Sequence, residues 1–268
     1  MENNKNNIKD SYAAKVMKVA GNAAKMTLQY GGGSNRAEEV FLRMCESCQV
    51  SDPQISAVST SISVSVIYDG EIYSSLFRVT RRGINLTKLN MINDLSRNFA
   101  AGSISLAEAQ EELCRIDAAV SKFDNYGILA AGFSSAFFAL LFNGGIIEFI
   151  LTFFIGGFIN YILSFFERAN SYSFVNNLLG GIIDGALAII MVVLFSQFNI
   201  TVSAEPIIVG AMMPLLPGLA MTNAIKDTIS GDYVSGVAGT MEAMSMAIAL
   251  AAGVAAVIGV SLHLGVML

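Results

Sequence analysis

Four acids occupy or border the most apolar stretches of this chain, and their carboxyl groups are suited to moving a proton. They are Glu148, Asp184, Glu205 and Glu242. A charge in hydrocarbon is costly, so such a residue usually faces a cavity or a partner and marks an ion or substrate path. Asp184 lies within a Gly-Gly-Ile-Ile-Asp-Gly run, and we expect it to carry a coupling proton. The alternative is a protonated acid that is hydrogen-bonded to a neighbouring helix.

The other ionisable residues of the apolar half are assigned plainer roles. We expect Glu148 and Glu205 to lie at the outer membrane interface, and His263 to be interfacial rather than a proton relay. Glu242 either faces the cytosol or points inward, where it would join the polar residues that precede it. The 13 methionines are dispersed, which favours gap-filling over a route for soft metals.

A second set of candidate residues surrounds a break in an apolar segment. Proline removes a backbone donor and disrupts a helix, and the freed carbonyls are tolerated in a membrane only where protein or a wet cavity satisfies them. Broken membrane helices often hold substrate sites. The plainer interpretation is a kinked helix followed by a cytosolic loop. We expect a substrate path formed by Pro214, Pro217, Gly218, Asn223, Asp227 and Glu242.

Cysteine and histidine content argues against metal and redox chemistry. Cys45 and Cys48 have the CxxC spacing of redox and metal sites. The remaining cysteine is Cys114 and the single histidine is His263, so a four-ligand zinc site cannot be assembled. We expect packed, reduced cysteines, no metal and no cofactor. No catalytic triad, carboxylate dyad or cofactor fingerprint is present, which disfavours an enzyme.

Composition places about half of the chain in a membrane. Of the 268 residues, 54% are hydrophobic and 14% charged, against about 25% charged residues in soluble domains. Only Arg168 and Lys226 of the 16 basic residues follow residue 125. We therefore predict a cytosolic α+β domain over residues 1–124 and a transmembrane helical domain over residues 125–268. The pI of about 4.9 argues against binding to nucleic acid.

The membrane domain is predicted to be an α-helical bundle of about five transmembrane helices. Each segment is long enough for most of a bilayer, although the first would span only about 25 Å. The third and fifth are rich in glycine and alanine, which lets helix backbones approach closely. The predicted spans are about 126–142, 146–165, 174–196, 205–222 and 238–265.

The N-terminal half is predicted to contain helices and a hairpin. Residues 10–29 have a helical apolar stripe, which favours a packed helix over a membrane-surface helix. The glycines after Tyr30 invite a phosphate-loop interpretation, but no Lys-Ser/Thr pair follows, so we expect a tight turn between helices. Asn35 and Glu38 are predicted to cap the next helix.

A hairpin is predicted over residues 55–82, with Asp69-Gly70 as its two-residue turn. Its serine-rich face is expected to be solvated, the alternative being the mouth of a pore. Helices are predicted over residues 86–101 and from Ser105, where Glu108 completes a capping box.

Orientation follows from positive charge. Arg168 lies in the second predicted loop and Lys226 in the fourth, whereas the loop over residues 196–203 has no basic residue. The positive-inside rule then places the N-terminal domain in the cytoplasm. With five spans, the C-terminus of this multi-pass plasma (inner) membrane protein would lie outside.

The run PGLAMTNAIKDTISGDYVSG, which begins at Pro217, resembles the signature of the threonine/serine exporter (ThrE) family and of its split relative, the YjjP-like dicarboxylate exporter subunit. YGGGSNRAEE from Tyr30, RRGIN from Arg81 and NGG from Asn143 match in the same order. The resemblance covers nearly the whole chain from about Tyr30. The sequence departs from the pattern of these relatives at Ala220, where a proline is frequent, and at Gly239, where an arginine is common.

The resemblance implies an exporter of small polar metabolites, threonine and serine in one branch and C4 dicarboxylates such as succinate in the other. The proton gradient would drive it, since no ATPase motif is present. The substrate carboxylate would bind half-helix amides near Pro217 and Gly218, with Asn223 and Asp227 on its polar groups. Full-length relatives carry further membrane helices beyond this signature, so we expect a second small membrane subunit and an oligomer.

Two other classes of function remain open. One is a membrane-anchored sensor or scaffold whose cytosolic domain binds a partner. The other is an intramembrane enzyme, which the lack of a Ser/His or Asp/Asp pair with motif context makes the weakest of the three.

Overall fold

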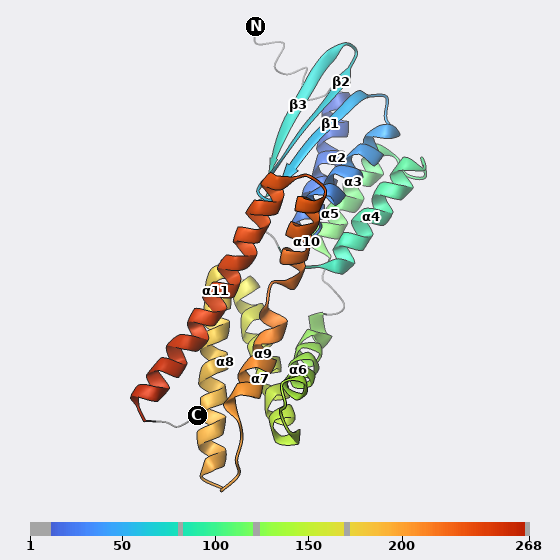
Figure 1. Cartoon of the computed structure of the whole chain (residues 1–268). Coiled ribbons are helices and arrows are strands. Elements are labelled where there is room, and N and C mark those ends of the chain that lie inside the picture. The colour runs from blue at the N-terminus through green and yellow to red at the C-terminus, as the bar shows by residue number, and fades with distance from the viewer. Residues whose placement is uncertain (1–11, 80–82, 120–123, 169–171, 266–268) are drawn as a thin grey trace. The chain divides into compact units, whose positions relative to one another are not determined.

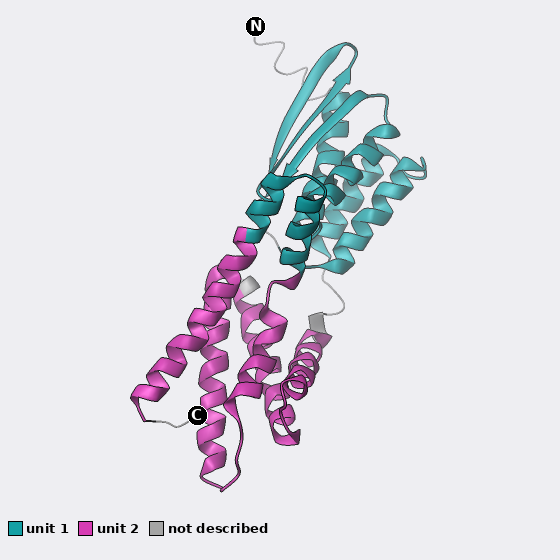
Figure 2. Ribbon diagram, viewed as in Figure 1, with its two compact units in different colours: residues 1–121, 219–240 teal, residues 122–218, 241–268 magenta. Residues whose placement is uncertain are grey.

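The computed structural model describes residues 12–79, 83–119, 124–168 and 172–265, and Figure 1 shows their helices and strands. Arg81 and Arg82 of the RRGIN run lie outside the described residues, and the side chain of Arg168, used above for orientation, is also not described. The chain divides into two compact units, coloured separately in Figure 2. Unit 1 comprises residues 1–121 and 219–240, and unit 2 comprises residues 122–218 and 241–268.

The N-terminal part of unit 1 combines helices with one small sheet. The helices are α2 (Tyr12–Gln29), α3 (Ser34–Glu46), α4 (Leu86–Ala100) and α5 (Leu106–Ala118). The strands are β1 (Ser51–Val58), β2 (Ser61–Tyr68) and β3 (Glu71–Arg78), antiparallel in the order β1-β2-β3. This agrees with the predicted helix-and-sheet character of the region.

The sheet has one strand more than the predicted hairpin. Strands β2 and β3 join at Asp69-Gly70, both with positive φ (52° and 79°), as the turn signal predicts. Strand β1 was missed because its start is irregular: the pairing register shifts between Ser51 and Gln54. Such a bulge interrupts the alternation by which strands are recognised.

One core lies between the helices and the sheet of unit 1. Helix α2 packs against β2 and β3, and α3 packs against β1. Each helix, and the central strand, contributes a large side chain that is almost fully buried: Leu28, Phe41, Ile62, Ile92 and Ile116. Burying a side chain of this size stabilises the fold by roughly 1.5–3 kcal/mol, so this cluster fixes the helices on the sheet.

The two predicted helix caps have different outcomes. The capping box of α5 is confirmed, since Ser105 accepts from the amide of Glu108 and Glu108 accepts from the amide of Ser105. The cap assigned to Asn35 is wrong, because α3 starts at Ser34 and Gly33 occupies the cap position. Glu38 instead accepts a hydrogen bond from the amide of Ala57 on β1 (3.0 Å).

The remaining elements are helical. They are α6 (Asp124–Leu141), α7 (Ile146–Arg168), α8 (Ser173–Ser196), α9 (Ala204–Met212), the 3₁₀ turn η1 (Met213–Leu215), α10 (Gly218–Ile229) and α11 (Tyr233–His263). Helix α10 and the first turns of α11 belong to unit 1, and Figure 2 shows them in its colour.

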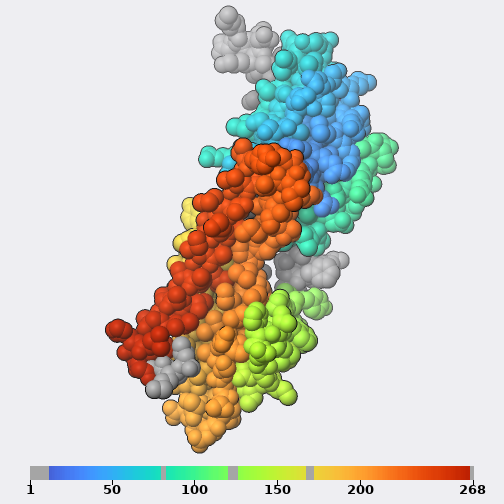
Figure 3. Space-filling model, viewed as in Figure 1, coloured from blue at the N-terminus to red at the C-terminus, as the bar shows by residue number. Residues whose placement is uncertain are grey.

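Three of these helices are long and apolar enough to cross a membrane: Ile146–Phe166, Ser173–Ser196 and Tyr233–His263. The pair Ala204–Leu215 and Gly218–Ile229 passes the same test as one broken span, and Tyr126–Leu141 is a shorter apolar helix. The described residues therefore contain three or four candidate spans, preceded by the helix-and-sheet region. Many apolar side chains along α11 are exposed, and this helix is visible along its length in the space-filling view of Figure 3.

Glycines let α8 and α11 pack closely. A Cβ atom on Gly253 would lie 2.9 Å from the amide nitrogen of Ile182, and one on Gly181 would lie 3.1 Å from the amide nitrogen of Val254. The first distance is too short for a side chain and the second is tight, so the two backbones approach closely where these residues lack side chains. The Gly/Ala-rich composition of the third and fifth predicted spans has this consequence.

Candidate functional site

The predicted helix break is present between α9 and α10. Pro214 lies in η1, and Leu216 leaves the helical conformation with φ −65° and ψ 135°. This extended conformation is the one favoured before a proline, here Pro217. The amide of Gly218 donates to the carbonyl of Leu216 (2.8 Å), and α10 starts at this glycine. The break is therefore short.

Asp184 is the most deeply buried acid of the described residues. Its exposed fraction is 0%, and no described group donates a hydrogen bond to either carboxylate oxygen. A buried ionised carboxylate without hydrogen bonds is strongly disfavoured. This environment distinguishes Asp184 from Glu148, which is hydrogen-bonded, and from Glu205, which is exposed.

The face of α8 that carries Asp184 also contacts the break. Gly180 lies one turn before Asp184, and a Cβ atom on Gly180 would lie 3.1 Å from Cδ1 of Leu215 in η1. Asn176 lies a further turn along the same face, is 7% exposed, and its Oδ1 accepts no hydrogen bond among the described residues. Sequence reasoning missed Asn176 because it stands at the predicted end of the span.

Glu148 has a defined structural role that its sequence position did not reveal. Its Oε2 accepts from the amide of Gly145 (2.9 Å), directly before α7. Its Oε1 accepts from the amide of Ser203 (3.1 Å), directly before α9. One carboxylate therefore joins the starts of two helices of unit 2.

Asn223 and Asp227, assigned above to the substrate, lie in unit 1 against the glycine turn that joins α2 and α3. Nδ2 of Asn223 donates to the carbonyl oxygen of Gly31 (3.0 Å). A Cβ atom on Gly33 would lie 3.5 Å from Oδ1 of Asp227, and Asp227 is only 5% exposed. The TNAIKD and YGGGSN runs are thus neighbours in the fold.

The SGD residues of the signature form the turn between α10 and α11. Gly231 has φ 88°, and the amides of Gly231 and Asp232 donate to carbonyls of Thr228 and Asp227 (3.1 and 3.0 Å). Asp232 then accepts from the amide of Ser235 (3.1 Å) and caps α11. Helix-end chemistry accounts for these residues without a ligand.

The glycine turn is not a phosphate loop. The amides of Gly31 and Gly32 donate to the carbonyls of Leu28 and Thr27 (3.3 and 2.8 Å), and Gly31 has φ 93°. This is a Schellman motif, which ends a helix. Because the two amides are used within the chain, they cannot cradle a phosphate, and the predicted tight turn is confirmed.

Three motif runs meet at the carbonyl end of α2. The carbonyls of Gln29 and Tyr30 accept from the amides of Gly83 and Asn85 (2.8 and 3.2 Å), and the carbonyl of Gly31 accepts from Asn223. The last carbonyls of a helix have no partner within it. The GIN residues of the RRGIN run and the TNAIKD run supply donors for them.

A polar network surrounds Tyr30. Its hydroxyl donates to Oδ1 of Asp117 (2.5 Å), and Nζ of Lys88 donates to the carbonyl of Asp117 (2.6 Å). Burial, followed by the hydrogen bond and the negative charge of Asp117, raises the pKa of Tyr30. The phenol therefore stays protonated and connects the end of α2 to the end of α5.

Glu38 is the ionisable residue of α3 that faces α10 and its loop. Burial raises the pKa of Glu38, the hydrogen bond from Ala57 lowers it, and the charges of Asp232 and Asp227 raise it further. Three carboxylates from two parts of the sequence thus lie near one another in unit 1. Among the described residues, however, no group of three His, Cys, Asp or Glu side chains has the geometry of a metal site.

The remaining predicted site residues are peripheral. Glu205, in the first turn of α9, and His263, at the end of α11, are exposed, and Glu242 is half-buried on α11. Cys45 is buried and Cys48 half-buried, and neither forms a disulfide. Burial raises the pKa of both thiols, which disfavours the reactive thiolate.

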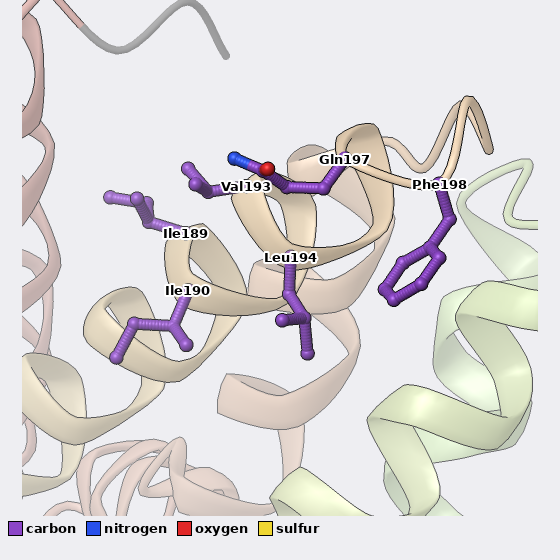
Figure 4. A pocket seen from close by; sticks show the side chains of 6 residues that line it. All are labelled: Ile189, Ile190, Val193, Leu194, Gln197 and Phe198. Carbon is purple, nitrogen blue, oxygen red and sulfur yellow. The ribbon is translucent and has the colours of Figure 1, made fainter.

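An open groove of about 510 Å³ lies at the C-terminal end of α8. Figure 4 shows the residues that line it, and among them only Gln197 is polar. A groove with this lining suits an apolar chain rather than an amino acid or a dicarboxylate. We therefore do not place the substrate there.

The fold and the buried acid define a membrane protein of several apolar helices with a helix-and-sheet unit at its N-terminus. A family model described as "Putative threonine/serine exporter" (ThrE) matches residues 18–261, and the chain belongs to this family. The family is one of transporters, so the protein is not an enzyme. Neither a curated protein nor a solved structure matched the chain.

Proposed function

We propose that the protein exports small polar carboxylates across the plasma membrane, driven by the proton gradient. Threonine and serine follow from the description of the family. C4 dicarboxylates such as succinate follow from the resemblance to the split exporters. A second small membrane subunit would complete the path, and the exposed apolar faces of α6 and α7 are available to it or to lipid.

Five spans, a cytoplasmic N-terminal domain and an external C-terminus complete this proposal. A parity argument supports the number. Residues 219–240 pack with the N-terminal helices and sheet in one unit, so both lie on the same side of the membrane. The chain must then cross an even number of times between residues 122 and 218, a condition that is met when the short helix α6 spans together with α7, α8 and α9. Helix α11 is the fifth span.

The observation that carries the proposal is the buried carboxylate of Asp184. An acid without hydrogen bonds on the central face of a span binds a proton readily, and it releases the proton when water or a cation reaches it. Its neighbour along that face, Gly180, contacts the break at Leu215. Asp184 is therefore our candidate for the proton-coupling residue.

Substrate recognition is proposed at the residues around the break. Pro214 and Pro217 interrupt the helix, and the amides that follow at Gly218 begin α10, where a carboxylate is stabilised by the helix dipole. Asp227 and Glu242 supply polar groups of the path, and Asn223 lies beside Asp227 on α10. Asn223 donates a hydrogen bond to the carbonyl oxygen of Gly31.

Efflux of labelled threonine, serine and succinate from proteoliposomes tests the function. The chain is reconstituted alone and with its candidate membrane partner, as wild type, Asp184→Asn and Asp227→Asn. We expect pH-driven efflux of one substrate class, reduced on the order of a hundredfold by Asp184→Asn because proton transfer by a positioned side chain contributes that much. Counterflow, in which labelled substrate inside the vesicle is exchanged for unlabelled substrate outside, should persist in Asp184→Asn because it requires no net proton movement.

Glu205→Gln is the matched control, because Glu205 is an exposed acid at the start of α9. It should leave efflux unchanged. Equal losses in Asp184→Asn and Glu205→Gln would remove Asp184 from the mechanism. No efflux of any of the three solutes in either setting would reject the proposed substrates and favour the sensor or scaffold alternative.

A further inference from the structure

Two runs that are far apart in the sequence form one contact within unit 1. The turn of Gly31 to Gly33 lies against Asn223 and Asp227 of α10. Further along, Oγ of Ser235, at the start of α11, donates to the carbonyl of Ala57 on β1 (3.1 Å). Ser235 is fully buried. The hairpin of α10 and α11 is therefore hydrogen-bonded to the glycine turn through Asn223 and to the sheet through Ser235.

Each of the three glycines of the turn serves this contact differently. Gly31 provides the positive φ that ends α2. Gly32 has no room for a side chain, because a Cβ atom would lie 2.8 Å from the carbonyl oxygen of Thr27. Gly33 faces α10, where a Cβ atom would make ordinary contacts of 3.5 and 3.8 Å with Asp227 and Asn223. The turn thus presents a bare backbone to α10.

The two helices of the α10–α11 hairpin pack closely against each other. A Cβ atom on Gly239 would lie 3.0 Å from Cβ of Ala224. A Cβ atom on Gly236 would lie 3.0 Å from the amide nitrogen of Thr228. The hydrogen bond of Ser235 to Ala57 therefore helps to keep Asn223 in position, and the hydrogen bond of Asn223 to Gly31 helps to keep Ser235 in position.

The other half of the broken pair is held separately within unit 2. Glu148 binds the amide of Ser203 before α9. A Cβ atom on Gly210 would lie 2.8 Å from the carbonyl oxygen of Ser135 on α6, so α9 touches the backbone of its neighbour. Each half of the pair is thus anchored in its own unit, and the break at Leu216 and Pro217 joins them.

We propose that the Gly31–Gly33 turn clamps α10, and that Asn223 and Ser235 are positioning residues of the exporter rather than substrate ligands. The N-terminal unit then serves to hold the second half of the broken helix pair in the orientation that transport needs. This inference rests on the proposed export function for its consequence in transport. The clamp itself is a contact that is tested without transport.

The first test is hydrogen–deuterium exchange of the full chain in detergent. Asn223→Ala and Ser235→Ala each remove one hydrogen bond, so we expect exchange of the amides of residues 218–240 to rise roughly two- to tenfold. Asn90→Ala and Ser230→Ala are the matched controls, because both side chains are exposed and lie in the same unit. Unchanged exchange in the first pair would overturn the clamp.

The second test restores the clamp by a different bond. Gly33→Cys and Asn223→Cys are combined after the native cysteines are replaced (Cys45→Ala, Cys48→Ser, Cys114→Ser). Cγ of Asn223, which lies about where the sulfur of a cysteine would lie, is 3.8 Å from a Cβ atom on Gly33, so the two positions are close enough to test for a disulfide. In the reduced state, the amides of residues 218–240 in this variant should exchange hydrogen for deuterium rapidly, and the variant should export poorly. In the oxidised state, the same amides should exchange at the wild-type rate or more slowly, and the variant should regain export.

Each outcome of the second test decides the matter. Recovery of export by the disulfide would show that Asn223 acts through position, since a disulfide cannot replace an amide that binds substrate. A crosslinked protein that stays inactive, or a pair that forms no disulfide, would overturn the proposal. If the wild type exports none of the three solutes, the proposed function is rejected. Hydrogen–deuterium exchange of residues 218–240 still tests whether the turn holds α10.

Discussion

At the scale of single residues, the turn between α2 and α3 shows why a glycine run needs a structure to be interpreted. Gly31 provides the backbone conformation of the turn, Gly32 the space that the turn needs, and Gly33 the contact with α10. The same residues in a phosphate loop would leave their amides free. Here the amides of Gly31 and Gly32 donate to carbonyls of α2 and end that helix. The glycine run therefore serves to end α2 and to contact α10.

Glu38 makes the stability of unit 1 depend on pH. Because its pKa in the folded chain is raised above the ordinary value of 4.5, folding favours the protonated form. The stability from this residue is fully present below that value and is lost as pH rises through the raised pKa. Glu38→Gln keeps an acceptor for the amide of Ala57 and removes the charge. We expect its Tm to exceed that of the wild type by about 2–4 °C at neutral pH.

The difference should vanish near about pH 4, where the wild-type carboxyl is also neutral. Thermal unfolding of the full chain in detergent between these pH values measures it. Glu39→Gln is the control, since the Glu39 side chain is 64% exposed and pairs with Arg43. A lower Tm for Glu38→Gln over the whole range would show that the charge of Glu38 stabilises the unit.

At the scale of elements, left-handed residues end helices throughout the chain. Besides Gly31 and Gly231, the residues Gly102, Asn143 and Asn199 have positive φ, and in each case the following amides donate back to the last turn of the helix. This geometry is usually supplied by glycine and sometimes by asparagine. The turns of the NGG and SGD runs are therefore set by local chemistry.

This explains what the sequence could and could not reveal. The break at Pro217, the Ser105 cap and the Asp69-Gly70 turn depend on neighbours along the chain, and each was predictable. The cap at Asn35 was wrong because Glu38 bonds instead to Ala57, which is distant in sequence. Asn223 was assigned to the substrate because the residues around it in the sequence do not indicate its hydrogen bond to the carbonyl of Gly31, 192 positions away. Long-range hydrogen bonds leave no periodic trace in the sequence.

Glu148 shows how one side chain can fix two elements. Without a carboxylate at this position, the amides of Gly145 and Ser203 would each lose their acceptor, and such a hydrogen bond contributes about 0.5–1.5 kcal/mol to stability. We expect Glu148→Ala to lose both bonds. Glu148→Gln should lose one, because its amide nitrogen cannot accept, so its stability should lie between those of Glu148→Ala and the wild type.

Thermal unfolding in detergent measures this order, with Glu205→Gln as an exposed acid of the same region. The graded result would confirm that the two oxygens act independently on α7 and α9. If Glu148→Gln were as stable as the wild type, one of the two bonds would contribute nothing and the carboxylate would cap a single helix.

At the scale of the whole molecule, the division into units constrains the path of the chain. The chain leaves unit 1 after residue 121, re-enters it at residue 219 and leaves it again after residue 240. The hydrogen bonds of Asn223 and Ser235 require the re-entering segment to lie on the same side of the membrane as the N-terminal helices. Hydropathy alone gives three or four spans. The requirement is met either by α7 and α8 alone or by α6, α7, α8 and α9 together.

Labelling of single cysteines tests this topology in a chain that lacks the native ones. Thr201→Cys lies in the exposed loop before α9, and Ser230→Cys lies in the exposed turn before α11. We expect a membrane-impermeant maleimide to label Thr201→Cys in intact cells, and to label Ser230→Cys only after the membrane is opened. We expect this because α9 and α10 together cross the membrane between residues 201 and 230, with Lys226 on the cytoplasmic side.

The pattern of labelling separates the alternatives. The opposite result, with Ser230→Cys labelled in intact cells and Thr201→Cys labelled only after the membrane is opened, would invert the orientation and place the N-terminal domain outside. Labelling of both positions from the same side would make α9 and α10 a re-entrant loop that does not cross. Parity would then require an even number of crossings by α6, α7 and α8 alone, so that α6 could not span. The measurement thus decides whether a helix too short for the hydropathy test is a membrane span.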